Sequence, residues 1–306
     1  MSIRKAVIPV SGFGTRLLPT TRALPKEMLP VGRYPTIQYV VEEMISTGVR
    51  EILFVTSGSK TIIADQFDNQ TALIAYLAQT EKLDLLEAFD YQARGVSFLY
   101  TRQQSPPGVL KPQGTGAAIA AAEQFVADQP FIVAYGDTII HSDLSPNYLS
   151  RLVASHMAHR SICTVGVRKV PREQIRLYGA VKPARSADID HGDFKISDIV
   201  EKPEPAEAPS ALAVNARYIF GPEIFEEIRQ VPLTPSGEIP VTPAIQNLIR
   251  RGQAVRAVKL APSEKRYDLG NHQDYYRAFI DFALRDTDYG EGTRSYIKSC
   301  IKNCSG

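Results

Sequence analysis

Short apolar runs alternate with amphipathic stretches along the first half of the chain. Runs of nearly continuous apolar residues are typical of strands buried on both faces of a parallel sheet, and they cover residues 4–10, 51–57, 96–103 and 130–137. Helical patterns cover 36–47, much of 60–90, and the Ala-rich stretch 114–126. This alternation predicts βαβ units, a parallel sheet and an α/β fold.

The second half of the chain has a more mixed pattern. Strands are expected at residues 161–169, 178–182, 196–201, 211–220 and 253–260, and helices at 222–229, 241–251 and 271–285. The polar segment 183–195 is expected on the surface. The polar tail 286–306 is expected to be partly disordered or to form an oligomer contact. We predict a Rossmann-like, mixed and mainly parallel central sheet flanked by helices.

Composition and charge exclude several classes of protein. The chain has 306 residues, of which 44% are apolar and 22% charged, and its formal net charge is +2. This balance provides no basic field for coating nucleic acid, and no apolar run approaches the roughly 20 residues that span a bilayer. The start, MSIRKAVIPVSG, is interpreted as a first strand and not as a signal peptide. We therefore expect neither nucleic acid nor membrane as a partner.

The three cysteines are too few for a disulfide scaffold. Cys163 lies in an apolar, strand-like run and is expected in the core. Cys300 and Cys304 have C-x3-C spacing, which could hold a metal or form a disulfide, but no partner Cys or His follows them. This cysteine usage predicts a cytoplasmic protein with reduced thiols.

The loop after the first strand is suited to binding a polyanion. Residues 11–30 (SGFGTRLLPTTRALPKEMLP) follow the carboxyl end of the strand, where open α/β sheets bind ligands. Gly12 and Gly14 let backbone N–H groups approach an anion closely. Positive charges suited to a triphosphate follow on Arg16, Arg22 and Lys26. The alternative is a glycine-rich turn with surface cations.

Two familiar phosphate-binding templates do not match this loop. A Walker A loop needs the pattern G-x-x-x-x-G-K-[ST], which is absent. A dinucleotide fingerprint needs a third small residue at the position of Leu17. Kinase-like and dehydrogenase-like functions are therefore not favoured.

The same residues resemble a known family. The pattern V-x-G-x-G-T-R-L-L-P-x-T-[KR]-x-x-P-K-E-M-L-P, followed by P-T-I-Q-Y-V-V-E-E, resembles the opening of the bacterial UTP–glucose-1-phosphate uridylyltransferases. These belong to the sugar-nucleotide pyrophosphorylase superfamily. The similarity is long and specific over residues 4–43 and extends over roughly 3–285. It implies a nucleotide-diphospho-sugar transferase fold with sugar-binding insertions.

The resemblance also implies an activity and a domain organisation. The implied enzyme forms UDP-glucose and pyrophosphate from UTP and glucose 1-phosphate, with Mg²⁺ as cofactor, and is a homodimer or homotetramer. Residues 1–286 would form one nucleotidyltransferase domain, with the nucleotide-binding half at about 1–140 and the sugar-phosphate-binding half at about 141–286. The polar tail 287–306 would follow this domain.

The residues that the resemblance assigns to nucleotide binding lie in the first loop and in two later motifs. By resemblance, Arg16 clamps the β- and γ-phosphates and Lys26 reaches the α-phosphate. Gln103, in the motif RQ, would read the uracil edge. The implied nucleotide-binding residues are Ser11, Gly12, Gly14, Thr15, Gln103 and Gly114. Glu27 matches a family position, but it could equally be structural.

Two aspartates resemble the metal ligands of the family. Asp137 in YGDT follows a predicted strand, and a carboxylate there suits Mg²⁺, which prefers hard oxygen ligands. Asp268 in YDLG resembles the second ligand. The two are far apart in sequence, so only the fold can bring them together.

The motifs YGAV and IVEKP resemble the sugar side of the family. Glu201 would accept hydrogen bonds from glucose hydroxyls, and Lys202 would neutralise the sugar phosphate. The backbone of Gly179 would contact the sugar. Asn215 stands where the family often has glycine, and it is a candidate for a further hydroxyl contact. Arg16, Lys26 and Lys202 are the implied catalytic residues.

Several positions depart from the family pattern. GTGAA (114–118) has Ala117 in place of the usual histidine, and SPPGVLKPQ before it is longer than the usual connection. GEIPVTPAI (237–245) has Pro243 in place of an aspartate, which a first helical turn tolerates. Two alternatives therefore stay open: the same chemistry with dTTP or another sugar 1-phosphate, and a non-catalytic paralogue that binds nucleotide-sugars.

Overall fold

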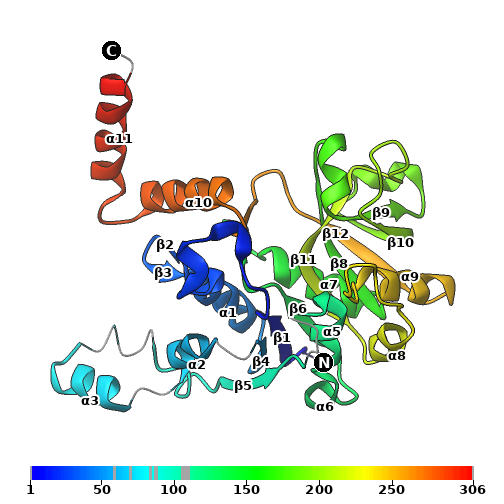
Figure 1. Cartoon of the computed structure of the whole chain (residues 1–306), viewed down its shortest axis with the longest axis horizontal. Coiled ribbons are helices and arrows are strands. Elements are labelled where there is room, and N and C mark those ends of the chain that lie inside the picture. Colours follow the sequence, from blue (N-terminus) through cyan, green and yellow to red (C-terminus); the bar gives the residue numbers. More distant parts are fainter. Residues whose placement is uncertain are drawn as a thin grey trace.

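A nine-stranded mixed sheet forms the centre of the fold (Figure 1). A computed structural model describes residues 2–57, 60–68, 71–82, 85, 89–104 and 111–304. Within these residues the strand order is β5-β4-β1-β6-β11-β8-β12-β10-β9, and β11 also pairs with β9. The strands are β1 (Lys5–Pro9), β4 (Glu51–Thr56), β5 (Ser97–Arg102), β6 (Phe131–Ala134), β8 (Cys163–Lys169), β9 (Gly179–Pro183), β10 (Asp193–Glu201), β11 (Leu212–Phe220) and β12 (Val255–Lys259).

Parallel pairing is concentrated in the N-terminal part of the sheet. β1 pairs in parallel with β4 and β6, and β4 pairs in parallel with β5. β11 enters antiparallel to β6 and β8, and β10 is antiparallel to β12 and β9. The predicted mixed α/β fold is confirmed. Because β1, β4, β5 and β6 run in the same direction, their carboxyl ends meet at one edge, where such sheets bind ligands.

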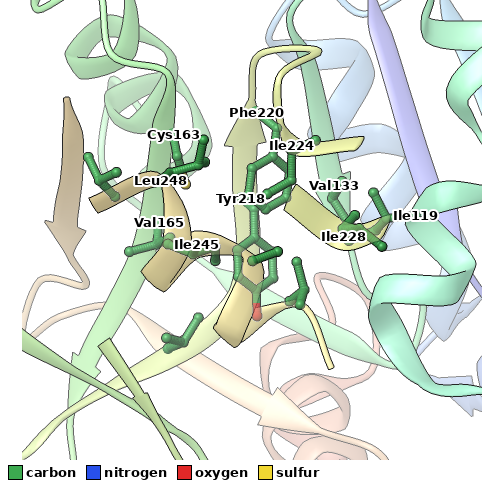
Figure 2. Packing of buried hydrophobic residues seen from close by; sticks show 14 of the residues in the cluster. Ile119, Val133, Cys163, Val165, Tyr218, Phe220, Ile224, Ile228, Ile245 and Leu248 are labelled. Carbon is green, nitrogen blue, oxygen red and sulfur yellow. The ribbon is translucent and has the colours of Figure 1, made fainter. Parts of the chain in front are cut away.

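Helices pack on both faces of the sheet (Figure 1). Their apolar stripes explain the packing, since each stripe faces one of two hydrophobic clusters. One cluster takes residues from α5, α8 and α9, as Figure 2 shows for Ile119, Ile228 and Leu248, and the other takes residues from α1, α2 and α7. The helices are α1 (Thr36–Ser46), α2 (Thr61–Phe67), α3 (Thr71–Gln79), α5 (Gly114–Ala120), α6 (Glu123–Val126), α7 (Tyr148–Ala158), α8 (Ile224–Arg229), α9 (Thr242–Arg250), α10 (His272–Arg285) and α11 (Gly290–Cys304).

Cys163 lies in the core, as predicted from the apolar run around it (Figure 2). Its side chain has 0% exposure, and burial raises the pKa of its thiol far above the ordinary value. A buried, protonated thiol behaves as a small apolar group. Cys300 is free, and the side chain of Cys304 lies outside the described part of the chain.

The surface prediction for residues 183–195 was wrong in part, and the tail forms a helix where partial disorder was one of two alternatives; the other alternative, an oligomer contact, stays a prediction. Residues 193–195, within the segment expected on the surface, pair with β12 because Phe194 and Ile196 alternate with polar residues and point into the core. The tail contains the helix α11, which extends away from the sheet in Figure 1. The guanidinium of Arg33 donates hydrogen bonds to the carboxylates of Asp286 and Asp288, each at 2.6 Å, and so fixes the segment just before α11.

Besides α11, the four strands of two small sheets and one further helix were missed from the sequence. β7 (Thr138–His141) pairs antiparallel with β13 (Lys265–Asp268), and β2 (Pro30–Val31) pairs with β3 (Tyr34–Pro35). The further helix is α7. Strands from both predicted halves of the domain share the large sheet, and the boundary at about residue 140 stays a prediction. None of the described helices is long and apolar enough to cross a membrane.

Candidate functional site

A cleft of about 680 Å³ opens beyond the carboxyl ends of β1 and β6. It is lined by the loop after β1, the turn after β6, the starts of α5 and β9, and the ends of β10 and β13. The predicted site residues that line it are Ser11, Gly12, Gly14, Thr15, Arg16, Lys26, Gly114, Asp137, Gly179, Glu201, Lys202 and Asp268. Gln103 and Asn215 are not among its lining residues.

The loop after β1 is a series of tight turns. Gly14 has a φ of 67° and caps the 3-10 turn Thr15–Leu17, a backbone conformation that glycine adopts without strain. The hydroxyl of Thr21 donates to Gly14 O at 2.8 Å and holds the loop closed. Arg16 reaches across the cleft, since a Cβ on Gly270 would lie 2.8 Å from Arg16 Nη2. The loop therefore presents a guanidinium opposite the segment that carries Asp268.

Lys26 and Asp137 form an ion pair inside the cleft. Their side chains are only 16% and 15% exposed. Burial opposes the charge on each group, but the opposite charges and hydrogen bonds around it together outweigh burial: the pKa of Lys26 is raised and the pKa of Asp137 is lowered. Both groups are therefore ionised at neutral pH, and a cation and an anion lie at the same point of the cleft.

The pairing of β7 with β13 brings the two distant aspartates together. Thr138 lies opposite Asp268 in this pairing, and Leu269 N donates to Asp137 O at 2.9 Å. Asp268 in turn accepts hydrogen bonds from Arg266 Nη2 at 3.0 Å and from Gly270 N at 3.1 Å. Arg266 also lines the cleft and was missed from the sequence, although it stands just before YDLG.

The donor set suits Mg²⁺. Asp137 and Asp268 both line the cleft and offer hard carboxylate oxygens. No group of three or more His, Cys, Asp or Glu side chains that could hold a metal is found in the described part of the chain. Mg²⁺ is usually bound through one or two carboxylates, with water and substrate phosphates completing its coordination. The two aspartates therefore fit Mg²⁺ better than they fit a structural zinc site.

Glu201 and Lys202 lie at the end of β10, next to Gly179 on β9. Glu201 is paired with Gly179 in the sheet, and Lys202 N donates to Tyr178 O at 3.1 Å. Lys202 has a φ of 44°, an uncommon conformation for a non-glycine residue and one that is enriched at functional sites. Its side chain is 58% exposed, and its ammonium lies 3.5 Å from Glu201. A cation and a carboxylate therefore share one side of the cleft.

Two tyrosines that the sequence analysis missed lie on the cleft wall. The hydroxyls of Tyr135 and Tyr218 are 3.2 Å apart, and both residues line the cleft. Burial raises the pKa of Tyr135 to about 12, so its hydroxyl is a neutral hydrogen-bonding group. Tyr135 follows β6 directly, which was a signal in the sequence, because side chains at strand ends reach the ligand edge.

Gln103 is half-buried next to Gly114, a residue that lines the cleft. Its Nε2 donates to Gly114 O at 3.3 Å, while its Oε1 is buried and has no hydrogen-bond partner among the described residues. The neighbouring SPPGVL (105–110) lies outside the described residues. The structure therefore brings Gln103 next to a residue of the cleft but not to its surface.

The prediction that Asn215 contacts the sugar was wrong. Its side chain is fully buried, and its Nδ2 donates to the hydroxyl of Tyr148 at 2.9 Å. Side chains alternate along β11, so Val214 and Ala216 line the cleft while Asn215 points to the other face of the sheet. Its surroundings there are tight, since a Cβ on Gly166 would lie 2.4 Å from its Oδ1.

The glycines of GTGAA are required by a close approach of the backbone. Gly116 N donates to Ile239 O at 2.7 Å, and a Cβ on Gly116 would lie 2.7 Å from that same oxygen. Ile239 N donates to Gln113 O at 2.6 Å, so GEIPVTPAI is fixed against the start of α5. The helix α9 begins at Thr242 with Pro243 in its first turn, as predicted.

Comparisons with known proteins show the family to which the chain is similar. Residues 5–284 match the model of a family described as nucleotidyl transferase. UTP–glucose-1-phosphate uridylyltransferase 1 of Staphylococcus saprophyticus is 37% identical over 302 residues, which is 99% of this chain and 100% of that protein.

Solved structures give the same result. UTP-bound UGPase from Acinetobacter baumannii has a TM-score of 0.84 and 32% identity, covering 96% of this chain and 98% of that one. A UDP-glucose pyrophosphorylase complexed with UDP-glucose has a TM-score of 0.80 and 31% identity, covering 93% of this chain and 100% of that one.

Proposed function

Because this chain belongs to the UTP–glucose-1-phosphate uridylyltransferases of the nucleotidyl transferase family, we propose that it forms UDP-glucose and pyrophosphate from UTP and glucose 1-phosphate with the help of Mg²⁺. The observation that carries the proposal is the cleft itself, in which Arg16, Lys26 and Lys202 lie around two aspartates. A triphosphate and a sugar phosphate bring several negative charges together, and such a cleft can neutralise them.

The reaction needs alignment and charge neutralisation more than proton transfer. A phosphate oxygen of glucose 1-phosphate forms a bond to the α-phosphorus of UTP, and the bond from that phosphorus to the oxygen bridging to the β-phosphate breaks. The attacking oxygen is already ionised at pH 7, so no general base is required. Pyrophosphate leaves with the bridging oxygen and its electron pair. The protein contributes by holding both substrates in line and by stabilising the developing charge.

Each cation has its own part in this proposal. Lys26 contacts the α-phosphate, where the transition-state charge develops, and Arg16 clamps the β- and γ-phosphates as they become the leaving group. Lys202 holds the phosphate of glucose 1-phosphate, and Glu201 accepts hydrogen bonds from the sugar hydroxyls. Asp137 and Asp268 would hold Mg²⁺, which supplies Lewis-acid stabilisation of phosphate charge when it is bound.

A substrate panel tests the function. Pyrophosphate release is measured with UTP, dTTP, ATP, CTP and GTP, each combined with glucose 1-phosphate, galactose 1-phosphate or mannose 1-phosphate, in the presence of Mg²⁺. We expect turnover with UTP and glucose 1-phosphate to exceed that of every other pair. A preference for dTTP or another sugar phosphate would change the substrate, and binding of UDP-glucose without any turnover would indicate a non-catalytic protein.

Lys202→Ala tests the sugar side. We expect the KM for glucose 1-phosphate to rise about tenfold or more, because a charge-assisted hydrogen bond to phosphate is lost, while the affinity for UTP changes little. Calorimetry with UTP and steady-state kinetics separate the two effects. Lys195→Ala is the matched control, since Lys195 is an exposed lysine on the same strand outside the cleft. An equal loss of UTP affinity in a folded Lys202→Ala variant would contradict the assignment.

A further inference from the structure

A buried ion pair joins the turn that carries Lys26 to the residue before α2. Lys60 Nζ donates to both carboxylate oxygens of Glu27, at 2.8 and 3.1 Å. The two side chains are only 7% and 2% exposed. Glu27 is the middle residue of the 3-10 turn Lys26–Met28, and Lys60 immediately precedes α2, so the pair joins two segments that are distant in sequence.

Stability alone does not explain this pair. Burial raises the pKa of Glu27 and lowers the pKa of Lys60, and each partner's charge opposes the shift of the other. An apolar pair of similar volume often gives equal or greater stability than a buried ion pair, because no charge then loses its hydration. The pair therefore calls for an explanation in its surroundings.

The surroundings are charged in alternating sign. Glu27 is next in sequence to Lys26, and Lys26 pairs with Asp137. The charges therefore alternate in sign along Lys60, Glu27, Lys26 and Asp137, and the last three of these residues line the cleft. Burial lowers the pKa of Lys26, and nearby negative charges raise it. Among these charges, Asp137 has the largest effect and Glu27 the second largest. The pair is thus electrostatically connected to a residue that lines the cleft.

We propose that Glu27 and Lys60 are positioning residues for Lys26, an inference that rests on the proposed function. Lys26 has to exchange Asp137 for the α-phosphate when UTP binds. Glu27 remains beside it, and Lys60 holds the carboxyl group of Glu27 in place through two hydrogen bonds. Lys60 also ties the turn 26–28 to the segment after β4, so the ammonium is directed at one point of the cleft. Glu27 lines the cleft beside Lys26 and Lys60 does not, and in this proposal both act through Lys26.

Two neutral double variants test the proposal. Glu27→Leu/Lys60→Met replaces both charges by apolar groups, and Glu27→Gln/Lys60→Gln replaces them by a hydrogen-bonding pair. In both we expect an unchanged or higher melting temperature, because no buried charge is left unpaired. We expect kcat with UTP and glucose 1-phosphate to fall about 10²-fold, as is typical when a reacting group is misplaced by about 1 Å. The KM for glucose 1-phosphate is expected to stay unchanged.

Arg151→Met is the matched control. Arg151 pairs with Glu264, whose side chain has 0% exposure, and neither residue lines the cleft. We expect this variant to melt at a lower temperature and to keep the wild-type kcat, because it leaves a buried charge unpaired away from the chemistry. The opposite behaviour of the double variants separates a positioning role from a purely structural one.

Hydrogen exchange provides a readout that does not depend on turnover. Met28 N donates to Pro25 O at 2.8 Å and Leu29 N to Lys26 O at 3.2 Å, so exchange at these amides reports the order of the turn. We expect faster exchange there in both double variants and unchanged exchange in Arg151→Met. Wild-type kcat in a folded double variant, or unchanged exchange in the turn, would overturn the positioning role. Absence of turnover in the wild-type protein would overturn the proposed function instead, and the exchange would still decide whether the pair orders the turn.

Discussion

Lys26→Met is expected to lower kcat by about 10²–10³-fold, the usual loss when one preorganised electrostatic contact to the transition state is removed. This corresponds to roughly 2.7–4 kcal/mol of transition-state stabilisation. The reason is the position of Lys26, whose ammonium is held in the cleft by Asp137 and is supported by Glu27. Methionine keeps most of the length of the side chain and removes the charge. The measurement is pyrophosphate release under saturating UTP and glucose 1-phosphate.

The control for this variant is Lys169→Met, which removes an exposed lysine at the end of β8, outside the cleft. We expect it to keep the wild-type kcat. Lys26→Met also leaves Asp137 without its main cation, so its folding has to be checked by thermal melting. A folded Lys26→Met variant with kcat within a few-fold of wild type would rule out a role of Lys26 at the α-phosphate.

The contiguous motifs of the sequence predicted most of the cleft. The loop after β1, the YGDT turn and the end of β10 each place residues that line the cleft within a few residues of a strand end. Because parallel strands present their carboxyl ends at one edge, recognising β1 and β6 was enough to predict that the first loop and the YGDT turn meet. The end of β10, an antiparallel strand, was assigned to the same site only through the family resemblance. The apolar runs were recognised because buried strands have few polar residues.

The residues that were missed or misplaced depend on tertiary structure. Lys60 lies far from Glu27 in sequence, and no local pattern predicts that the two form an ion pair. Arg266 was missed because it comes close to Asp137 only through the pairing of β7 with β13, strands of four residues each that have no strong apolar pattern. The same pairing positions Asp268, which the family resemblance had implied.

Asn215 shows that the sequence pattern did not predict which face of a strand a single side chain occupies. The motif AVNARYIF was correctly assigned to a strand that borders the cleft. A shift of one residue along a strand exchanges its two faces, however. The register of β11 also shifts between Val214 and Tyr218, where Ala216 has a φ of 67°. The sequence therefore predicted the right strand and the wrong face.

Asp137→Asn is expected to reduce turnover at fixed Mg²⁺ by about 10²-fold or more, because a Lewis-acid contact to phosphate contributes several kcal/mol. Asparagine keeps the shape of the side chain and an oxygen that can accept from Lys26, but it loses the negative charge that a hard cation prefers. We expect the concentration of Mg²⁺ needed for half-maximal turnover to rise, and we expect EDTA to abolish the activity of the wild-type protein. Binding of Mn²⁺ in the presence of UTP, followed by electron paramagnetic resonance, gives a second readout.

Asp268→Asn provides the comparison within the same site. Asp268 accepts from Arg266 and Gly270, and its side chain is 25% exposed, compared with 15% for Asp137. If both aspartates hold the cation, each variant weakens Mn²⁺ binding, and the double variant shows little further loss, because groups that act as a unit are not additive. Full turnover of wild-type protein in EDTA would show that the two carboxylates only balance Lys26 and Arg266. Weakened Mn²⁺ binding in Asp137→Asn alone would assign the cation to Asp137 and leave Asp268 as the counterion of Arg266.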